Sequence, residues 1–137
     1  IVLSPSGGAL AKMLLPFRLG LGGMVGAGTH YMSWVTLDDT VGAIHHALIT
    51  DTVRGPLNIT APQPVTNSEF TATLGRVLRR PTVLSLPTSV LRLALGVGAD
   101  ELLLSSTRII PRQLRDTHYP FRHPELEVAF RHLLGKA

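Results

Sequence analysis

The sequence predicts an α/β fold in which the last strands and helices of a Rossmann-like parallel sheet are followed by a small, mostly helical cap. Three observations support this class. Short β-forming runs alternate with segments of helical periodicity in the first half of the chain, as in parallel sheets. Helical patterns dominate the second half. Hydrophobic residues make up 45% and charged residues 16% of the 137 residues, an ordinary globular composition.

The first strand is expected over residues 1–3, because β-forming residues there run into a turn of Ser, Pro and Gly. Residues 9–19 have apolar side chains at helical spacing, and Pro16 inside this pattern should kink or tighten the helix. A glycine-rich loop is predicted over residues 20–28, and a single strand over residues 31–37.

Asp38 or Asp39 is expected to cap the next helix, over about residues 40–50, because a carboxylate accepts hydrogen bonds from the free N–H groups of a helix start. A short strand is predicted over residues 57–60. Thr66 and Glu69 have the spacing of a capping box, which predicts that a helix starts there and continues to about residue 78.

The rest of the chain is predicted to contain a strand over residues 82–85 and then helices. The helices cover residues 87–95, residues 100–117 with a bend at Pro111, and residues 123–135. We therefore divide the chain into residues 1–60, the end of the sheet with its substrate-side loops, and residues 61–137, a small α-rich substrate or cap domain.

The turn over residues 4–8 is the best candidate for ligand binding. It lies at the carboxyl end of a predicted strand, where open α/β sheets bind ligands. Its glycines and the helix start favour an anion, which Lys12 could also reach. Ordinary βα turns use the same residue types, so that reading stays open. The glycines of residues 20–26 are not a dinucleotide fingerprint, because Val25 occupies the third glycine position.

No catalytic and no metal site is predicted. Neither tyrosine is followed by Lys four residues later, as an acid/base pair of the Tyr-x-x-x-Lys type requires. The adjacent carboxylates Asp38 and Asp39 are interpreted as helix caps. His45 and His46 are adjacent and cannot share one helix face. His118, His123 and His132 have no carboxylate or imidazole partner at ligand spacing. Each of these histidines is interpreted as structural or exposed.

The formal net charge of +4 is compatible with anionic partners. Arg108, Arg112 and Arg115 are spaced as a basic helix stripe, interpreted as a solvated face. Nucleic-acid binding is not expected, because only 5% of residues are aromatic.

No apolar run has the roughly 18 residues of a membrane span. The absence of cysteine makes a reducing cytoplasm the simplest location. The first residues lack the features of a signal peptide, and we expect the chain to be part of a longer protein.

Several blocks of the sequence resemble, in the same order, the epimerase family of the atypical short-chain dehydrogenase/reductase group, including its small C-terminal domain of the DUF1731 type. These blocks are residues 1–23, 26–39, 55–58, 64–70 and 121–126. They span essentially the whole chain. Thr36 stands where relatives commonly have His; it can make a local hydrogen bond but cannot supply an imidazole.

The resemblance implies a parent protein of about twice this length, whose N-terminal Rossmann half binds NADP or NAD. This chain would be the substrate-side part of an NAD(P)-dependent sugar-nucleotide epimerase/dehydratase-like oxidoreductase, inactive alone and without tight cofactor binding. The alternative is a non-catalytic binding or regulatory module of the same fold. The implied cofactor contacts are Ser4, Pro5 and Ser6, and the implied substrate contacts are Gly7, Gly8, Lys12, Arg18, Tyr31 and Trp34.

The expected partner is a small molecule, for example a nucleotide sugar, rather than nucleic acid or a membrane. A parallel sheet normally has both faces covered. We therefore expect the chain by itself to self-associate through exposed strand edges and apolar faces, or to rearrange.

Overall fold

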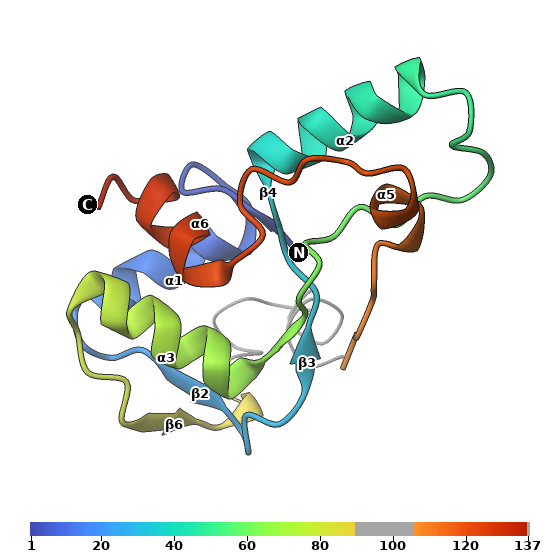
Figure 1. Ribbon diagram of the computed structural model, residues 1–137. Helices are drawn as coiled ribbons and strands as arrows, with labels where there is room; N and C mark the ends of the chain where they lie inside the picture. The colour runs from blue at the N-terminus through green and yellow to red at the C-terminus, as the bar shows by residue number, and fades with distance from the viewer. Residues whose placement is uncertain (90–105, 137) are drawn as a thin grey trace.

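The computed structural model describes residues 1–89 and 106–136 (Figure 1). In these ranges the strands are short: β1 (Val2–Leu3), β2 (Gly23–Val25), β3 (Tyr31–Met32), β4 (Val35–Thr36), β5 (Val65–Thr66) and β6 (Leu84–Leu86). The helices are α1 (Gly8–Arg18), α2 (Leu37–Ile49), α3 (Asn67–Leu78), α5 (Arg112–Asp116) and α6 (Leu126–Leu133). None of the helices in the described ranges is long and apolar enough to cross a membrane.

The strands form three separate pairs. β1 lies parallel to β4, with Leu3 opposite Thr36, and β2 lies parallel to β6. β3 and β5 are antiparallel. The predicted α/β class with parallel pairing is thus confirmed, and the antiparallel pair is an addition to it.

The core lies where α1, α3 and α6 meet, on one side of the molecule in Figure 1. The rings of Phe70 and Phe130 pack edge to face there, with centroids 5.1 Å apart. Helix α2 projects from this core as an arm. The core contains side chains from residues 1–60 and from residues 61–137, and the predicted domain boundary between them stays a prediction.

Local signals identified three helices correctly. α1 buries Leu10, Leu14 and Phe17, the apolar face seen in the sequence. The capping box starts α3: the Thr66 hydroxyl accepts from the Glu69 N–H at 3.2 Å, and the Glu69 carboxylate accepts from the Thr66 N–H at 2.7 Å. α6 lies within the predicted range of residues 123–135.

The prediction of a loop over residues 20–28 is wrong, because this segment contains β2. Gly23 explains why a glycine-rich segment forms a strand here. A Cβ atom at this position would lie 1.8 Å from the Leu84 carbonyl oxygen, so the close approach of β2 to β6 requires glycine.

The predicted strand over residues 31–37 is broken into β3 and β4, which pair with different partners. Ser33 lies at the break. Its hydroxyl donates to the Thr107 carbonyl at 2.7 Å and accepts from the Ile109 N–H at 2.9 Å. These bonds hold the extended segment of residues 106–109 against the break between β3 and β4.

Two further predictions are wrong in the described ranges. Residues 57–60 form no strand. Residues 106–111 are not helical, so that α5 is the only helical part of residues 106–117. The backbone of residues 106–109 instead bonds to β3 and Ser33: Thr107 N–H donates to the Tyr31 carbonyl at 3.0 Å. The predicted strand over residues 82–85 is shifted to β6. Most of the helix predicted over residues 87–95, and the start of the one from residue 100, lie outside the described residues.

Candidate functional site

A cavity of about 610 Å³ opens beside α5. This volume is in the range of small-molecule sites. Three of its lining side chains are arginines and one is an aspartate, so its charge balance is positive. Its lining comprises Asn58, Arg108, Ile109, Ile110, Arg112, Arg115 and Asp116. A smaller adjoining hollow shares Asn58, Ile110 and Arg112 with it.

The position of α5 is fixed by one buried side chain and one polar clamp. Leu114 is fully buried and anchors the helix to the rest of the molecule. On the neighbouring turn, the Gln113 amide donates to the Pro56 carbonyl at 2.6 Å and accepts from the Arg54 N–H at 3.2 Å. The clamp joins α5 to the segment that carries Asn58, and so forms two walls of the cavity.

Arg108, Arg112 and Arg115 do not form the basic helix stripe predicted from their spacing, because Arg108 lies in the extended segment before α5. The three side chains line one cavity instead. The Arg108 guanidinium lies over the Tyr31 ring, 4.9 Å from its centroid, in cation–π geometry. Tyr31, which the family resemblance assigned to the substrate, therefore lies next to the cavity wall.

The turn of Ser4 to Gly8 follows β1, as expected. Ser4 and Gly7 form an isolated antiparallel bridge, and the Ser6 N–H donates to the Ser4 hydroxyl at 3.3 Å. Gly8, the first residue of α1, has a φ of +67°, which favours glycine. Pro5 and Ser6 are exposed. The five residues thus form one compact turn with accessible backbone.

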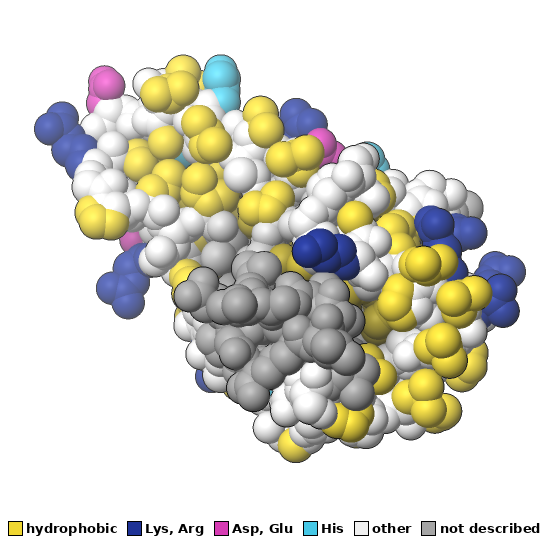
Figure 2. Space-filling model, turned by 180° about the vertical axis from the view of Figure 1, so that it is seen from behind, with side chains coloured by type: hydrophobic (Ala, Val, Ile, Leu, Met, Phe, Trp, Pro, Cys, Tyr) yellow, Lys and Arg dark blue, Asp and Glu magenta, His cyan; other side chains and the backbone are white. Residues whose placement is uncertain are grey.

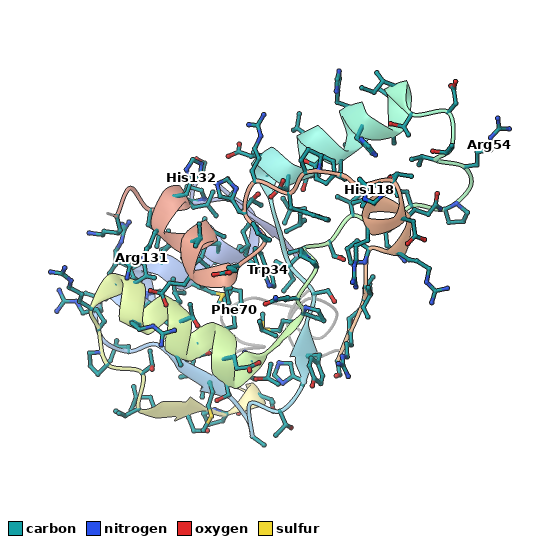
Figure 3. The ribbon with its side chains drawn as sticks, in the orientation of Figure 1. Trp34, Arg54, Phe70, His118, Arg131 and His132 are labelled. Atoms are coloured by element: carbon teal, nitrogen blue, oxygen red, sulfur yellow. The ribbon has the colours of Figure 1, made fainter. Side chains whose placement is uncertain are left out.

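The other residues implied by the resemblance are dispersed. Lys12 and Arg18 are exposed, one in the middle of α1 and the other at its end. Trp34 points into the core (Figure 3), with 1% of its surface exposed and its indole N–H donating to the Gln63 carbonyl at 3.0 Å. In the described chain its ring is a packing element between β4 and the helices.

A buried polar network surrounds Asp39. The capping prediction for Asp38 or Asp39 is wrong, because Thr36 is the N-cap of α2 and its hydroxyl accepts from the Asp39 N–H at 3.2 Å. The hydroxyl takes the role because the helix begins earlier than predicted, at Leu37. The Asp39 carboxylate is 1% exposed and accepts backbone N–H bonds from Arg122 at 2.8 Å and His123 at 2.9 Å.

The Tyr119 hydroxyl belongs to the same network and donates to the Asp39 carboxylate at 3.1 Å. Burial, together with the negative charge of Asp39 and this hydrogen bond, raises the pKa of Tyr119 to about 12. The network fastens the segment before α6 to the first turn of α2.

Asp38, His123 and His132 come together beside this network, although the sequence suggested no ligand partner for the histidines. One potential ligand atom from each lies within 4.8 Å of the others. His132 Nε2 is 3.0 Å from the Asp38 carboxylate, and the two imidazole rings stack with centroids 4.3 Å apart. His132 faces the start of α2 (Figure 3). Only tertiary packing joins α2 to α6, so no local spacing could have revealed this cluster.

The turn and the cluster lie at the same sheet edge. β1 and β4 are parallel, with Leu3 opposite Thr36. Ser4 and Leu37, the next residues, therefore lie at the shared carboxyl end of the pair, the edge at which open α/β sheets bind ligands.

Comparisons with known proteins agree with this architecture. Residues 86–133 match the family described as "Domain of unknown function (DUF1731)". The chain is 46% identical over 123 residues to epimerase family protein Mb2239 of Mycobacterium bovis, an alignment that covers 90% of this chain and 41% of that protein.

Two solved structures are also similar. The human epimerase family protein SDR39U1 (isoform 2), crystallised with NADPH, superposes on all of this chain with a TM-score of 0.90 and 39% identity, and 46% of it is covered. A Corynebacterium glutamicum protein described as a nucleoside-diphosphate sugar epimerase has a TM-score of 0.70 and 31% identity, over 98% of this chain and 25% of that one. The chain thus spans less than half the length of each of these relatives.

Proposed function

Because this chain corresponds to the C-terminal part of the epimerase family proteins, we propose that it is the substrate side of an NAD(P)-dependent epimerase or related oxidoreductase. Its substrate class would be a nucleoside-diphosphate sugar. The cofactor would be held mainly by the part of the longer relatives that this chain does not span. Two similar proteins support these assignments, one crystallised with NADPH and one described as a nucleoside-diphosphate sugar epimerase.

The observation that carries the proposal is the convergence of Arg108, Arg112 and Arg115 on one cavity. A diphosphate carries at least two negative charges, and guanidinium groups bind phosphate oxygens in a bidentate manner. The Asn58 amide could donate to or accept from a sugar hydroxyl, and Tyr31 beside Arg108 offers an aromatic ring for stacking against the planar base.

The turn after β1 fits a contact with one end of the cofactor. Ser4 and Ser6 supply hydroxyl groups, and Gly8 leaves backbone accessible at the carboxyl edge of the β1–β4 pair. In this proposal Ser4, Pro5 and Ser6 contact the cofactor, while Gly7, Gly8 and Lys12 contact the substrate. The nicotinamide, when bound, supplies the hydride transfer. The residues of this chain would orient the sugar and exclude water.

The proposal is tested by calorimetric titration of the chain with uridine diphosphate as the probe. Arg112→Ala and Arg115→Ala should each weaken binding by roughly 10- to 150-fold, the equivalent of the roughly 1.5–3 kcal/mol of a charged hydrogen bond. Arg80→Ala, which removes one exposed arginine elsewhere, is the matched control. Equal affinities in all four proteins would refute the arginine cavity as the diphosphate site.

We propose in addition that the isolated chain self-associates. Helix α2 has a stripe of exposed apolar side chains at helical spacing, Leu37, Val41, Ile44 and Leu48, each between 47% and 80% exposed. Hydrophobic side chains gather on this arm in Figure 2. An apolar face of this extent is typical of a contact surface.

A further inference from the structure

We propose that Asp38, His123 and His132 form a binding site for a divalent transition metal ion, with Zn²⁺ the best match. The site joins the first turn of α2 to the segment before α6, which carries His123, and to the last turn of α6, which carries His132. It is independent of the proposed nucleotide-sugar cavity, with which it shares no residue.

The ligand set supports Zn²⁺. Two imidazoles and one carboxylate are a common three-residue combination for zinc, which leaves a fourth position for water. The metal–ligand bonds of about 2.0–2.1 Å in a tetrahedral site place ligand atoms roughly 3.3 Å apart. The 3.0 Å between His132 Nε2 and the Asp38 carboxylate already suits this spacing.

The hydrogen bonds around His123 prepare one of its nitrogens as a ligand. Its Nδ1 lies 3.3 Å from the Thr36 hydroxyl oxygen, which in turn lies 3.3 Å from the Asp39 carboxylate. Since a carboxylate only accepts, the Thr36 hydrogen is best directed to Asp39. The Thr36 oxygen then accepts from His123 Nδ1–H. The proton on Nδ1 leaves the Nε2 lone pair available for a metal ion.

Asp39 completes this arrangement as an outer partner. It is 1% exposed, lies 3.8 Å from His123 Nδ1 and also accepts the His123 backbone N–H. A carboxylate or hydroxyl behind the second ring nitrogen is the usual support of a metal-binding histidine, because it fixes the tautomer and the ring orientation.

The exposed members of the site can complete the geometry. A metal ion must lie in the planes of both imidazole rings, whereas the rings of His123 and His132 now stack at 28°. His132 therefore turns about its side-chain torsions, and the ligand atoms, now up to 4.8 Å apart, close by roughly 1.5 Å to tetrahedral spacing. The His132 and Asp38 side chains are 53% and 42% exposed, which leaves room for this rotation.

The test is calorimetric titration of the 137-residue chain with ZnCl₂ at neutral pH, repeated with Co²⁺, whose visible absorption reports tetrahedral coordination. We expect one site with micromolar or tighter affinity. His132→Ala and Asp38→Asn should each weaken Zn²⁺ binding at least 10-fold, because outer-shell changes alone cost 10–100-fold. His45→Ala removes an exposed histidine of α2 outside the cluster and should bind as the parent chain does.

Circular dichroism of each variant checks that the fold is kept, which we expect because both substituted ligands are on the surface. Absence of Zn²⁺ binding by the parent chain would overturn the proposal. Binding that is unchanged in His132→Ala and Asp38→Asn would overturn it as well, because the ion would then be held by other histidines.

Discussion

The Tyr119 hydroxyl donates a hydrogen bond of 3.1 Å to the carboxylate of Asp39, a residue 80 positions earlier in the chain. This contact joins the start of α2 to the segment before α6. The same carboxylate accepts the backbone N–H groups of Arg122 and His123. One buried side chain thus positions both His123 and the end of the chain.

Replacing Asp39 should destabilise the fold strongly. Asp39→Ala leaves the backbone N–H groups of Arg122 and His123 without their acceptor, and an unsatisfied buried donor costs about 1–3 kcal/mol. We expect a loss of about 2–4 kcal/mol in the free energy of unfolding, measured by urea denaturation. Asp38→Ala is the control. The Asp38 side chain is 42% exposed, and its removal should change the free energy of unfolding by no more than about 0.5 kcal/mol. Equal effects of the two substitutions would show that the network is not a structural anchor.

The stability of the chain should fall at high pH because of Tyr119. Its pKa is about 12 in the folded chain against 10.0 for the unperturbed side chain. Below pH 10 both states keep the proton. Between pH 10 and 12 the unfolded state releases this proton first. The free energy of unfolding therefore falls as the pH rises through that window.

The absorbance of tyrosinate during a pH titration measures this pKa directly. The chain has two tyrosines, so Tyr31→Phe leaves Tyr119 as the only reporter. Its midpoint should lie near 12 and move toward 10 when the folded state is lost in denaturant. A midpoint near 10 in the folded Tyr31→Phe chain would contradict the contact with Asp39.

Gly23→Ala should separate β2 from β6. The new Cβ atom would lie 1.8 Å from the Leu84 carbonyl oxygen, so the two backbones must move apart. Overpacking of this kind costs about 1–3 kcal/mol, measured as a lower midpoint of urea unfolding. Gly7→Ala is the matched control, because a Cβ there meets no atom within 4 Å and its φ of −170° suits any residue. A Gly23→Ala chain as stable as Gly7→Ala would disprove the close strand pairing.

The exposed stripe of α2 should drive self-association of the isolated chain. Light scattering should give an average mass above 14.8 kDa that rises with concentration. The double substitution Ile44→Glu and Leu48→Glu places charge on the stripe and should return the mass to that of a monomer. Val83→Glu, at a position 87% exposed outside α2, should not. A parent chain that is monomeric at all concentrations would refute self-association through this stripe.

Much of the helical structure could be predicted because its signals are local. Thr66 and Glu69 are three residues apart, and the apolar face of α1 repeats within one helix. The strand β2 could not be predicted in this way, since its ladder depends on Leu84, some 60 residues later. Nor could the break at Ser33, which is fixed by bonds to Thr107 and Ile109.

The same difference between local and long-range signals applies to the candidate site. The turn after β1 could be recognised from its glycines at a strand end. Arg108, Arg112 and Arg115 were visible as basic residues, but their convergence on one cavity depends on the contacts of Tyr31 with Ser106 and Arg108. Asp38 and His132 are 94 positions apart, and only the tertiary fold brings them together.

We propose that this chain is the substrate side and that the cofactor is held elsewhere. Fluorescence titration of the chain with NADPH and NADH tests this most directly. Uridine diphosphate is titrated calorimetrically into the same preparation. We expect saturable binding of uridine diphosphate and no saturable micromolar binding of either cofactor. Micromolar, saturable NADPH binding would contradict this expectation, and would make the Ser4–Gly8 turn the candidate for a cofactor site complete in this chain or completed by a second copy.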